Sequence, residues 1–438
     1  MKFDYKNILI MGYGESGKAV EKILKNLNIN YRIYDKSHGV NGGGYLCRLS
    51  RKIISTFDLI VISPGISIYN KYIIMAERMG IKVVGELEFG YWFTSSPVIG
   101  ITGTNGKTTT TMMINEIANT TYTSGAYGNI GIPLCCAYQK QVDYLVCEVS
   151  SFQLESTYSF NPYISVILNI AEDHIDRHKT FENYIKCKLG LIKNCNEKSL
   201  IVLNADDKLL MERTVNIKAR KFYFSKYKKV KGVYLIDEDI YINIKNKPYK
   251  FASFKDFEHL STVIEDVLAS ILVGALMQID EDKIRIAIKN FSLAPHRMKL
   301  ILERNNVKYI DDSKSTNVHS TLNALSVSSN GIVLLLGGED KDLNFDEIFV
   351  KYSGKLSYVV AFGKARKKIE KCAIKCGFVN IKSFKTFVEA VKAGYALAKG
   401  NGVLLLSPAC ASFDEFNSYV ERGEKFEKII KDLSNAKS

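Results

Sequence analysis

The chain has 438 residues, of which 46% are hydrophobic and 24% are charged, and its formal net charge is +14. This is an ordinary globular composition, and the length suits about three domains at roughly 150 residues each. No apolar run reaches the roughly 18 to 20 residues that span a bilayer, and the N-terminal segment lacks a signal-peptide pattern. We therefore expect a cytoplasmic protein without an integral membrane segment.

The distribution of positive charge and the pattern of cysteines indicate the kind of partner and the compartment of the protein. The excess lysine is spread along the chain and is densest over residues 218–231, where no helix-turn-helix or RNA-binding signature accompanies it. We therefore expect no nucleic-acid partner and interpret the charge as suited to an anionic small substrate. The nine cysteines form no C-x-x-C pair, and their odd number favours free thiols in a reducing compartment.

The first segment of the chain follows a β-α-β pattern. A strand over residues 7–11 leads into a turn with G-x-G-x-x-G spacing, and an amphipathic helix follows. A second strand, 31–34, ends at Asp35, and a third covers 59–62. This pattern predicts a Rossmann-like N-terminal domain over residues 1–93.

A second α/β segment surrounds the loop GTNGKTTTT, residues 103–111. Its expected strands lie at 98–102, 144–149, 164–169, 200–203 and within 220–255, and a helix is expected at about 261–277. We predict a central domain over residues 94–294 with a mostly parallel sheet and a P-loop type of ATP site.

The last segment alternates short apolar strands with helices. The expected strands lie at 332–336, 358–362 and 403–406, and the expected helices include 387–397 and 419–433. This alternation predicts a Rossmann-like C-terminal domain over residues 295–438. The whole chain is therefore expected to be an α/β protein of three domains in series.

The loop at 103–111 carries glycine, lysine and threonine at 106–108 in the order of a nucleotide triphosphate site, although Ile101 stands where the usual spacing has glycine. Backbone N–H groups of such a loop bind phosphate oxygens, the lysine neutralises the terminal phosphates, and the threonine hydroxyl binds Mg²⁺. Magnesium also prefers carboxylates, and Glu148 ends a neighbouring strand. His174, in EDHIDRH, follows another strand, which favours a role at the same site.

Several motifs in order resemble one enzyme family. GTNGKTT, EVSSFQLE, ILNIAEDHIDRH and LNADD resemble the Mur ligases, which are ATP-dependent amide-forming enzymes of peptidoglycan synthesis. In the last segment, DDSKSTN, LLLGGEDKDLNF and LSPACASFDEF resemble the branch of the family that adds D-glutamate. The resemblance covers essentially the whole chain. It implies that ATP phosphorylates the alanyl carboxylate of UDP-N-acetylmuramoyl-L-alanine and that the amine of D-glutamate then attacks the acyl phosphate. It also implies that two Mg²⁺ ions take part. We expect the protein to be a monomer.

The resemblance also assigns roles to residues. Those implied in catalysis are Lys107, Glu148, His174, Lys188 and Lys314. Those implied in ATP binding are Gly103, Thr104, Asn105, Gly106, Lys107, Thr108, Thr109, Arg297 and Asp312. Those implied in binding the UDP-linked substrate are Gly14, Glu15, Ser16, Asp35, Lys36, Gly65 and Asn129, and those implied in binding D-glutamate are Thr316, Lys341, Ser412 and Tyr419. The implied metal ligands are Thr108, Glu148, His174 and Lys188, the last as a carbamate formed from its neutral amine and CO₂.

Three positions depart from the family pattern. Glu265 stands where an asparagine usually contacts adenine, Tyr419 where phenylalanine is common, and Lys36 where arginine is often found, so the adenine and uracil contacts stay open. The rival interpretations are another Mur ligase or a folylpolyglutamate synthase, an NAD-dependent oxidoreductase, which would explain only the N-terminal segment, and a basic ATPase acting on nucleic acid. The asparagine–proline–arginine motif typical of the diaminopimelate or lysine adders does not occur, which favours the D-glutamate branch.

Overall fold

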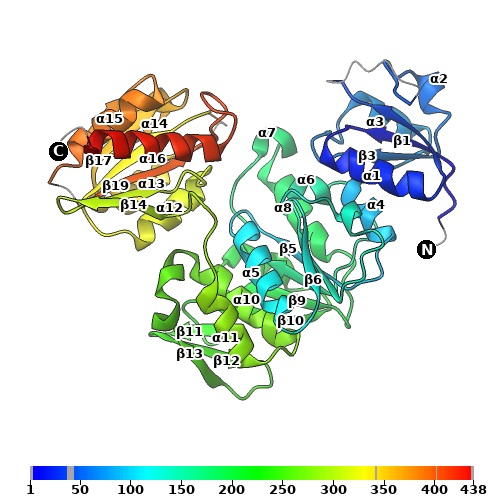
Figure 1. Cartoon of the computed structure of the whole chain (residues 1–438), viewed down its shortest axis with the longest axis horizontal. Helices are drawn as coiled ribbons and strands as arrows, with labels where there is room; N and C mark the ends of the chain where they lie inside the picture. The colour runs from blue at the N-terminus through cyan, green and yellow to red at the C-terminus, as the bar shows by residue number, and fades with distance from the viewer. Residues whose placement is uncertain (1–2, 37–43, 341–342, 401, 436–438) are drawn as a thin grey trace. The chain divides into compact units, whose positions relative to one another are not determined.

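The computed structural model describes residues 3–36, 44–340, 343–400 and 402–435. Three α/β sheets succeed one another along the chain (Figure 1). The chain divides into two compact units, Met1–Glu258 with Val263–Phe291, and His259–Thr262 with Ser292–Ser438. The first unit holds two sheets and the second holds one. The predicted α/β class with three domains and mostly parallel sheets is confirmed, whereas the predicted domain boundaries stay predictions.

The N-terminal sheet has four parallel strands in the order β2-β1-β3-β4. Its elements are β1 Asn7–Met11, α1 Glu15–Asn26, β2 Asn30–Tyr34, α2 Arg51–Ile54, β3 Leu59–Ile62, α3 Lys71–Arg78, β4 Lys82–Gly85 and α4 Glu86–Trp92. Alternate residues of β1 enter different apolar clusters, Ile8 and Ile10 on one face of the sheet and Leu9 and Met11 on the other. A parallel sheet buried on both faces explains why its strands are nearly continuous apolar runs.

The central sheet has nine strands in the order β13-β12-β11-β10-β9-β8-β5-β7-β6. Its strands are β5 Val98–Thr102, β6 Ser124–Gly128, β7 Tyr144–Glu148, β8 Ile164–Ile167, β9 Leu200–Asn204, β10 Arg220–Ser225, β11 Gly232–Ile236, β12 Asp239–Asn243 and β13 Tyr249–Ser253. Pairing is parallel from β6 to β11 and antiparallel from β11 to β13. The β-rich stretch expected at 220–255 is therefore an extension of the parallel sheet.

The helices of this part are α5 Lys107–Asn119, α6 Ser151–Leu154, α7 Ile175–His178, α8 Phe181–Leu189, α9 Lys208–Thr214, α10 Ile264–Leu276 and α11 Glu281–Asn290, with 3₁₀ segments η1 Leu134–Ala137, η2 Gly190–Ile192 and η3 Phe254–Val263. The helix expected at 261–277 starts as a 3₁₀ segment and becomes α-helical only at Ile264. The sequence analysis did not anticipate β6 or α11. β6 has the sequence SGAYG and lies at the sheet edge, so it lacks the apolar run of a central strand.

One helical stretch of the described residues, Phe254–Leu276, is long and apolar enough by length and composition alone to cross a membrane. Of its most apolar window, 61% is buried, and α10 packs against α5 and against β9, β10 and β11. The core helix of a folded domain passes the same test, so this stretch is weak evidence for a membrane segment.

The C-terminal sheet has six strands in the order β14-β15-β19-β16-β17-β18, with only β14 antiparallel to its neighbour. Its elements are β14 Lys299–Arg304, β15 Val307–Asp311, α12 Val318–Val327, β16 Ile332–Gly337, α13 Asp346–Tyr352, η4 Ser353–Lys355, β17 Leu356–Phe362, α14 Arg366–Lys375, β18 Ile381–Ser383, α15 Phe387–Leu397, β19 Val403–Ala409 and α16 Tyr419–Asn435. Helices α12, α13 and α14 pack on one face, and α15 and α16 lie together on the other (Figure 1). Asn305 and Asn306 both have positive φ, which makes the tight β14–β15 hairpin that sequence analysis overlooked.

Candidate active site

The phosphate loop lies between β5 and α5 and rests on the segment that follows β8. The N–H of Thr104 donates to the carbonyl of Asn169 at 3.0 Å, and the N–H of Asn105 donates to its side-chain oxygen at 2.9 Å. Gly106 has φ +84°, a left-handed conformation that favours glycine. A Cβ on Gly106 would also lie 2.1 Å from Oδ1 of Asp266. This close approach shapes the N-terminus of α5, where backbone N–H groups can bind phosphate.

The lysine of the loop turns over the loop itself. Nζ of Lys107 donates to the carbonyls of Gly103 and Thr104, both at 2.8 Å, which places its charge where terminal phosphates would lie. The hydroxyl-bearing Thr108 is partly exposed, while Thr109 is buried at the start of α5. The predicted ATP-binding residues of residues 103–109 thus form one continuous loop and helix start.

Lys188, on α8, lies beneath this loop. Its side chain is buried, and Nζ donates to the carbonyl of Gly103 at 2.6 Å and to Oγ1 of Thr102 at 3.3 Å. Burial holds the pKa of Lys188 well below its ordinary value, and the nearby charge of Lys107 acts in the same direction. The amine of Lys188 is therefore placed directly against the phosphate loop.

Glu148 ends β7 beside Ile101 of β5, two residues before the loop begins. Its Oε1 accepts a hydrogen bond from Nδ2 of Asn129 at 2.9 Å. Its Oε2 is buried and has no hydrogen-bond partner among the described residues. A buried carboxylate oxygen without a partner is uncommon in folded proteins and suits a bound cation.

His174 is the N-cap of α7 and has φ +54°. Its ring is half-buried, packs edge-on against Phe152 with centroids 4.8 Å apart, and has Nε2 3.7 Å from Oδ2 of Asp173. Glu148 is the carboxyl-terminal residue of β7, and His174 follows the carboxyl end of β8; both strands pair with β5. The sheet therefore places these two predicted ligands on the edge that carries the loop.

The glycine turn of the N-terminal domain is held by two side chains. The N–H of Tyr13 donates to Oδ2 of Asp35 at 2.6 Å, and the hydroxyl of Ser63 donates to the carbonyl of Gly12 at 3.0 Å. Gly17 packs so closely that a Cβ would lie 2.2 Å from the carbonyl oxygen of Gly12. These contacts match the roles of the first and third glycines in a Rossmann-like turn.

Most of the predicted UDP-substrate residues are accessible at this turn. Gly14, Glu15, Lys36 and Gly65 are exposed, and Ser16 is half-buried. A Cβ on either of these two glycines would meet none of the described atoms within 4 Å, which leaves room for a ligand. Asn129, which is also predicted for this substrate, lies instead beside Glu148 in the central domain.

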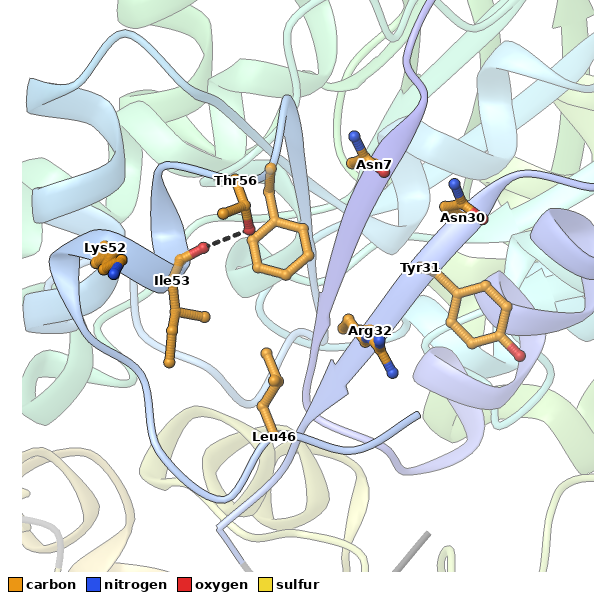
Figure 2. Close-up of a pocket in the computed structure, with 9 residues that line it drawn as sticks. Asn7, Asn30, Tyr31, Arg32, Leu46, Lys52, Ile53 and Thr56 are labelled. Atoms are coloured by element: carbon orange, nitrogen blue, oxygen red, sulfur yellow. Dashed lines mark hydrogen bonds between the residues drawn. The ribbon is translucent and has the colours of Figure 1, made fainter. Parts of the chain in front are cut away.

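A cavity of about 730 Å³ lies elsewhere in the N-terminal domain (Figure 2). It is lined by Asn7, Asn30, Tyr31, Arg32, Leu46, Lys52, Ile53, Thr56 and Phe57. Asn7 and Asn30 begin β1 and β2, so the cavity lies at the amino ends of strands whose carboxyl ends carry the glycine turn. None of the predicted site residues that the structure describes lines it.

In the C-terminal unit, the carboxyl group of Asp312 is buried and the charge of Arg297 is close to it. Asp312 accepts hydrogen bonds from the hydroxyls of Ser315 and Ser407. Burial raises the pKa of Asp312 to about 6, against the effect of these bonds and of the charge of Arg297. Nε of Arg297 is buried without a hydrogen-bond partner among the described residues, so this donor is available to an anionic group.

The described residues that are predicted to bind D-glutamate all belong to this unit. Nζ of Lys314 lies 5.7 Å from the ring centroid of Tyr419, Ser412 is buried, and Thr316 is half-buried. Lys341 lies outside the described residues. Arg422 was not expected from the sequence to have a role. It is fully buried and donates to Ser313, after β15, and to the carbonyl of Cys410, after β19, so it joins these two loops.

Glu265 is one of the residues that depart from the family pattern. Glu265 forms an ion pair with Lys226 at 2.8 Å, on the side of α10 near β10. The next residue, Asp266, is the one that approaches the phosphate loop at Gly106. Asp266 was not among the residues expected from the sequence. Successive residues of a helix point about 100° apart, so Glu265 meets Lys226 while Asp266 approaches the loop.

Comparison with known proteins finds related domains along the whole chain. A Mur ligase MurD-like N-terminal domain matches residues 6–85, a Mur ligase middle domain matches 101–264, and a Mur ligase glutamate ligase domain matches 296–410. The UDP-N-acetylmuramoylalanine–D-glutamate ligase of Thermoanaerobacter sp. (strain X514) is 36% identical over 99% of this chain and 100% of its own length. That of Clostridioides difficile (strain 630) is 35% identical over 98% of this chain and 99% of its own.

A solved MurF ligase from Thermotoga maritima, in complex with ADP, superposes with a TM-score of 0.58 at 16% identity, over 98% of this chain and 96% of that one. This likeness concerns the fold alone. Together, the three domain matches in order and the full-length relatives show that this chain belongs to the Mur ligase family.

Proposed function

We propose that the chain is an ATP-dependent ligase that joins the amine of D-glutamate to the alanyl carboxylate of UDP-N-acetylmuramoyl-L-alanine in peptidoglycan synthesis. The observation that carries this proposal is the full-length similarity, at 36% identity, to a relative with that name. The phosphate loop, with Lys107 lying over its carbonyls, supports ATP as the phosphoryl donor. A cytoplasmic location and a monomeric state belong to the same proposal.

The proposed reaction has two steps. A carboxylate oxygen of the alanyl group attacks the γ-phosphorus of ATP, the bond to the bridging oxygen breaks, and ADP leaves. The amine of D-glutamate then attacks the acyl carbon, phosphate leaves, and the amine loses a proton to solvent. Lys107 and the N–H groups at the start of α5 would stabilise the charge on the transferring phosphoryl group.

The fold family implies Mg²⁺, and the residues present fit it. Oε2 of Glu148 is a buried carboxylate oxygen without a partner among the described residues, and hard cations prefer such ligands. We propose that Thr108, Glu148 and His174 hold the ions. Bound Mg²⁺ would supply charge neutralisation at the phosphates and the carboxylate.

We further propose that Lys188 acts as a carbamate. The neutral amine that its burial favours has a lone pair that attacks CO₂, an N–C bond forms, and the nitrogen loses a proton to solvent. The product is an oxygen ligand of the type that magnesium prefers, whereas an ammonium group would repel the ions.

The carbamate is tested with ¹³C-bicarbonate. The wild-type enzyme should give a carbamate carbon signal in the NMR spectrum that Lys188→Ala lacks, and Lys188→Arg should be inactive because a guanidinium cannot take up CO₂. Lys186→Ala, which changes an exposed lysine of the same helix, is the matched control and should keep both signal and activity. Full activity in CO₂-free buffer together with no signal would contradict the assignment.

In the C-terminal unit we propose that Arg297 and Asp312 face the nucleotide. Lys314, Thr316, Lys341, Ser412 and Tyr419 are proposed to hold D-glutamate or the reacting phosphate. D-glutamate presents two carboxylates, so lysines with hydroxyl donors should discriminate against neutral amino acids. Lys341→Ala should raise the KM for D-glutamate far more than the KM for ATP, and equal effects on both would refute this role.

The function is tested by measuring phosphate release while one component is varied at a time. With ATP, Mg²⁺ and UDP-N-acetylmuramoyl-L-alanine present, D-glutamate should give sustained release. L-Glutamate, L-lysine and diaminopimelate should give little. Faster release with another amino acid, or release that ignores the UDP-linked substrate, would overturn the proposal in favour of another ligase of the family or a simple ATPase.

A further inference from the structure

A buried cluster of charged side chains joins the two helices that flank the candidate site. Glu155 follows α6, and its carboxylate accepts from the guanidinium of Arg177 at 2.7 Å. The other carboxylate oxygen lies 3.1 Å from Nδ1 of His178. The side chains of Glu155 and His178 are 2% and 1% exposed, so this is a desolvated charge network rather than a surface ion pair.

The imidazole of His178 extends the network to α6. Its Nε2 lies 3.0 Å from the hydroxyl oxygen of Ser151. Burial tends to raise the pKa of Glu155, but hydrogen bonds from His178 and Arg177 hold it below its ordinary value, so Glu155 is a carboxylate. A hydrogen bond to this carboxylate requires a proton on Nδ1 of His178, and Nε2 shares a hydrogen bond with the hydroxyl of Ser151.

Two other interpretations of this cluster fail. A Ser-His-Glu order resembles a hydrolytic triad, but Ser151 is 3% exposed and has no room for a substrate at its hydroxyl. Glu155, His178 and Cys187 also have the spacing of a metal site. The guanidinium of Arg177 already occupies that carboxylate, and burial raises the pKa of Cys187 to about 11, so the thiol stays protonated.

The cluster connects the two segments that carry the predicted metal ligands. Ser151 lies three residues after Glu148, and the N–H of His178 donates to the carbonyl of His174 at 3.0 Å. The ring of Phe152 lies between the cluster and the site, 4.8 Å from the ring of His174 and 4.7 Å from the guanidinium carbon of Arg177. The contacts of Ser151, Phe152, Arg177 and His178 thus link the segments that carry Glu148 and His174.

Arg177 also reaches the N-terminal domain. Its guanidinium donates to the carbonyls of Ile66 at 3.0 Å and of Pro64 and Gly65 at 3.4 Å each. Three consecutive carbonyls of the loop after β3 therefore converge on one side chain. Gly65 is among the residues assigned to the UDP-linked substrate, so this loop and the catalytic segments meet at Arg177.

We propose that Arg177, fixed by Glu155 and His178, is a positioning residue that holds the substrate loop Pro64–Ile66 in register with the segments of Glu148 and His174. It acts through these segments and touches no reacting atom. Because the UDP-linked substrate has to extend from the N-terminal domain to the phosphate loop, this joint determines whether its alanyl carboxylate arrives at the reacting position. The proposal rests on the proposed function for its substrate.

The kinetic test separates positioning from general stability. Arg177→Lys keeps a positive charge but loses the planar fork, and Arg177→Met loses both. Both should raise the KM for the UDP-linked substrate by about tenfold to a hundredfold, the size expected for hydrogen bonds to a charged group. The KM values for ATP and D-glutamate should stay within about twofold. Glu155→Gln should give a weaker change in the same direction, and its effect should not add to that of Arg177→Met.

A matched control exists on the surface of the same domain. Arg213 forms a comparable two-pronged pair with Glu182, at 42% and 43% exposure, and contacts neither segment. Arg213→Met should leave all three KM values unchanged. If Arg177→Met also left them unchanged, or raised all three equally in step with a lower thermal midpoint, the positioning role would be refuted.

Hydrogen exchange gives a readout that does not depend on turnover. In Arg177→Met, amides of residues 63–70 and of 172–178 should both exchange faster, and in Arg213→Met neither should. If hydrogen exchange at residues 63–70 were unchanged in Arg177→Met, the proposed link between the two segments would be refuted. If the wild-type enzyme released no phosphate with D-glutamate, the proposed function would fall, and the exchange result alone would then decide whether Arg177 couples the two segments.

Discussion

Glu86 offers a test in which the effect of pH on stability follows from one buried carboxyl group. It is the first residue of α4, is 1% exposed, and accepts from the N–H of Cys135 at 2.7 Å through Oε1. Its Oε2 is buried without a partner among the described residues. Burial raises the pKa of Glu86 from 4.5 to about 6, although the hydrogen bond from Cys135 lowers it.

The sign and size of the effect follow from the two pKa values. Because the folded state holds the proton more tightly, stability falls as pH rises from about 4.5 through about 6. At 1.36 kcal/mol per pKa unit, the full loss is about 2 kcal/mol. About 1.3 kcal/mol of it falls between pH 5 and pH 8. Glu86→Gln carries no such proton and should lack this part of the pH dependence.

The assay uses the only tryptophan of the chain, Trp92, which lies on the same helix as Glu86. Unfolding in urea is followed by its fluorescence at pH 5 and pH 8 for the wild type, for Glu86→Gln, and for the exposed control Glu197→Gln. Relative to the wild type, Glu86→Gln should gain about 1.3 kcal/mol on going from pH 5 to pH 8, whatever its absolute stability. A gain below about 0.4 kcal/mol, or an equal gain in Glu197→Gln, would refute the reasoning.

Three further predictions concern the loop and the junction of the first two domains. Lys107→Ala should abolish phosphate release while the circular dichroism spectrum stays unchanged, and near-normal turnover would show that the loop is not the ATP site. Gly106→Ala should raise the KM for ATP at least about tenfold, because its φ is +84° and its Cβ would meet Asp266. Gly14→Ala, which meets no described atom within 4 Å, should leave the KM for ATP unchanged. Glu88→Ala should lower the free energy of unfolding by about 3 kcal/mol or more. The Glu88 carboxylate accepts hydrogen bonds from the N–H groups of residues 158, 159 and 160, and all three would lose their partner. A loss below about 1 kcal/mol would contradict this expectation.

The sequence alone determined the fold class and the place of the phosphate loop. Strands such as β3 and β16 are short, continuous apolar runs, because a parallel sheet is covered on both faces, and such runs can be recognised without a structure. The loop is equally local, since its glycine, lysine and threonine act through neighbouring backbone. The edge strand β6 and the hairpin strand β14 were missed, because an edge or hairpin strand needs no such run.

Only the tertiary structure decided which side chains meet. Lys188 and the carbonyl of Gly103 are 85 residues apart in sequence, so neither the burial of the amine nor its depressed pKa could be read from its helix. The motif EDHIDRH by itself gives Arg177 no role, because the carbonyls that its guanidinium contacts lie more than 100 residues earlier in the chain. Periodicity and motifs report local backbone and one buried face, whereas desolvation and hydrogen bonding depend on partners brought by distant segments.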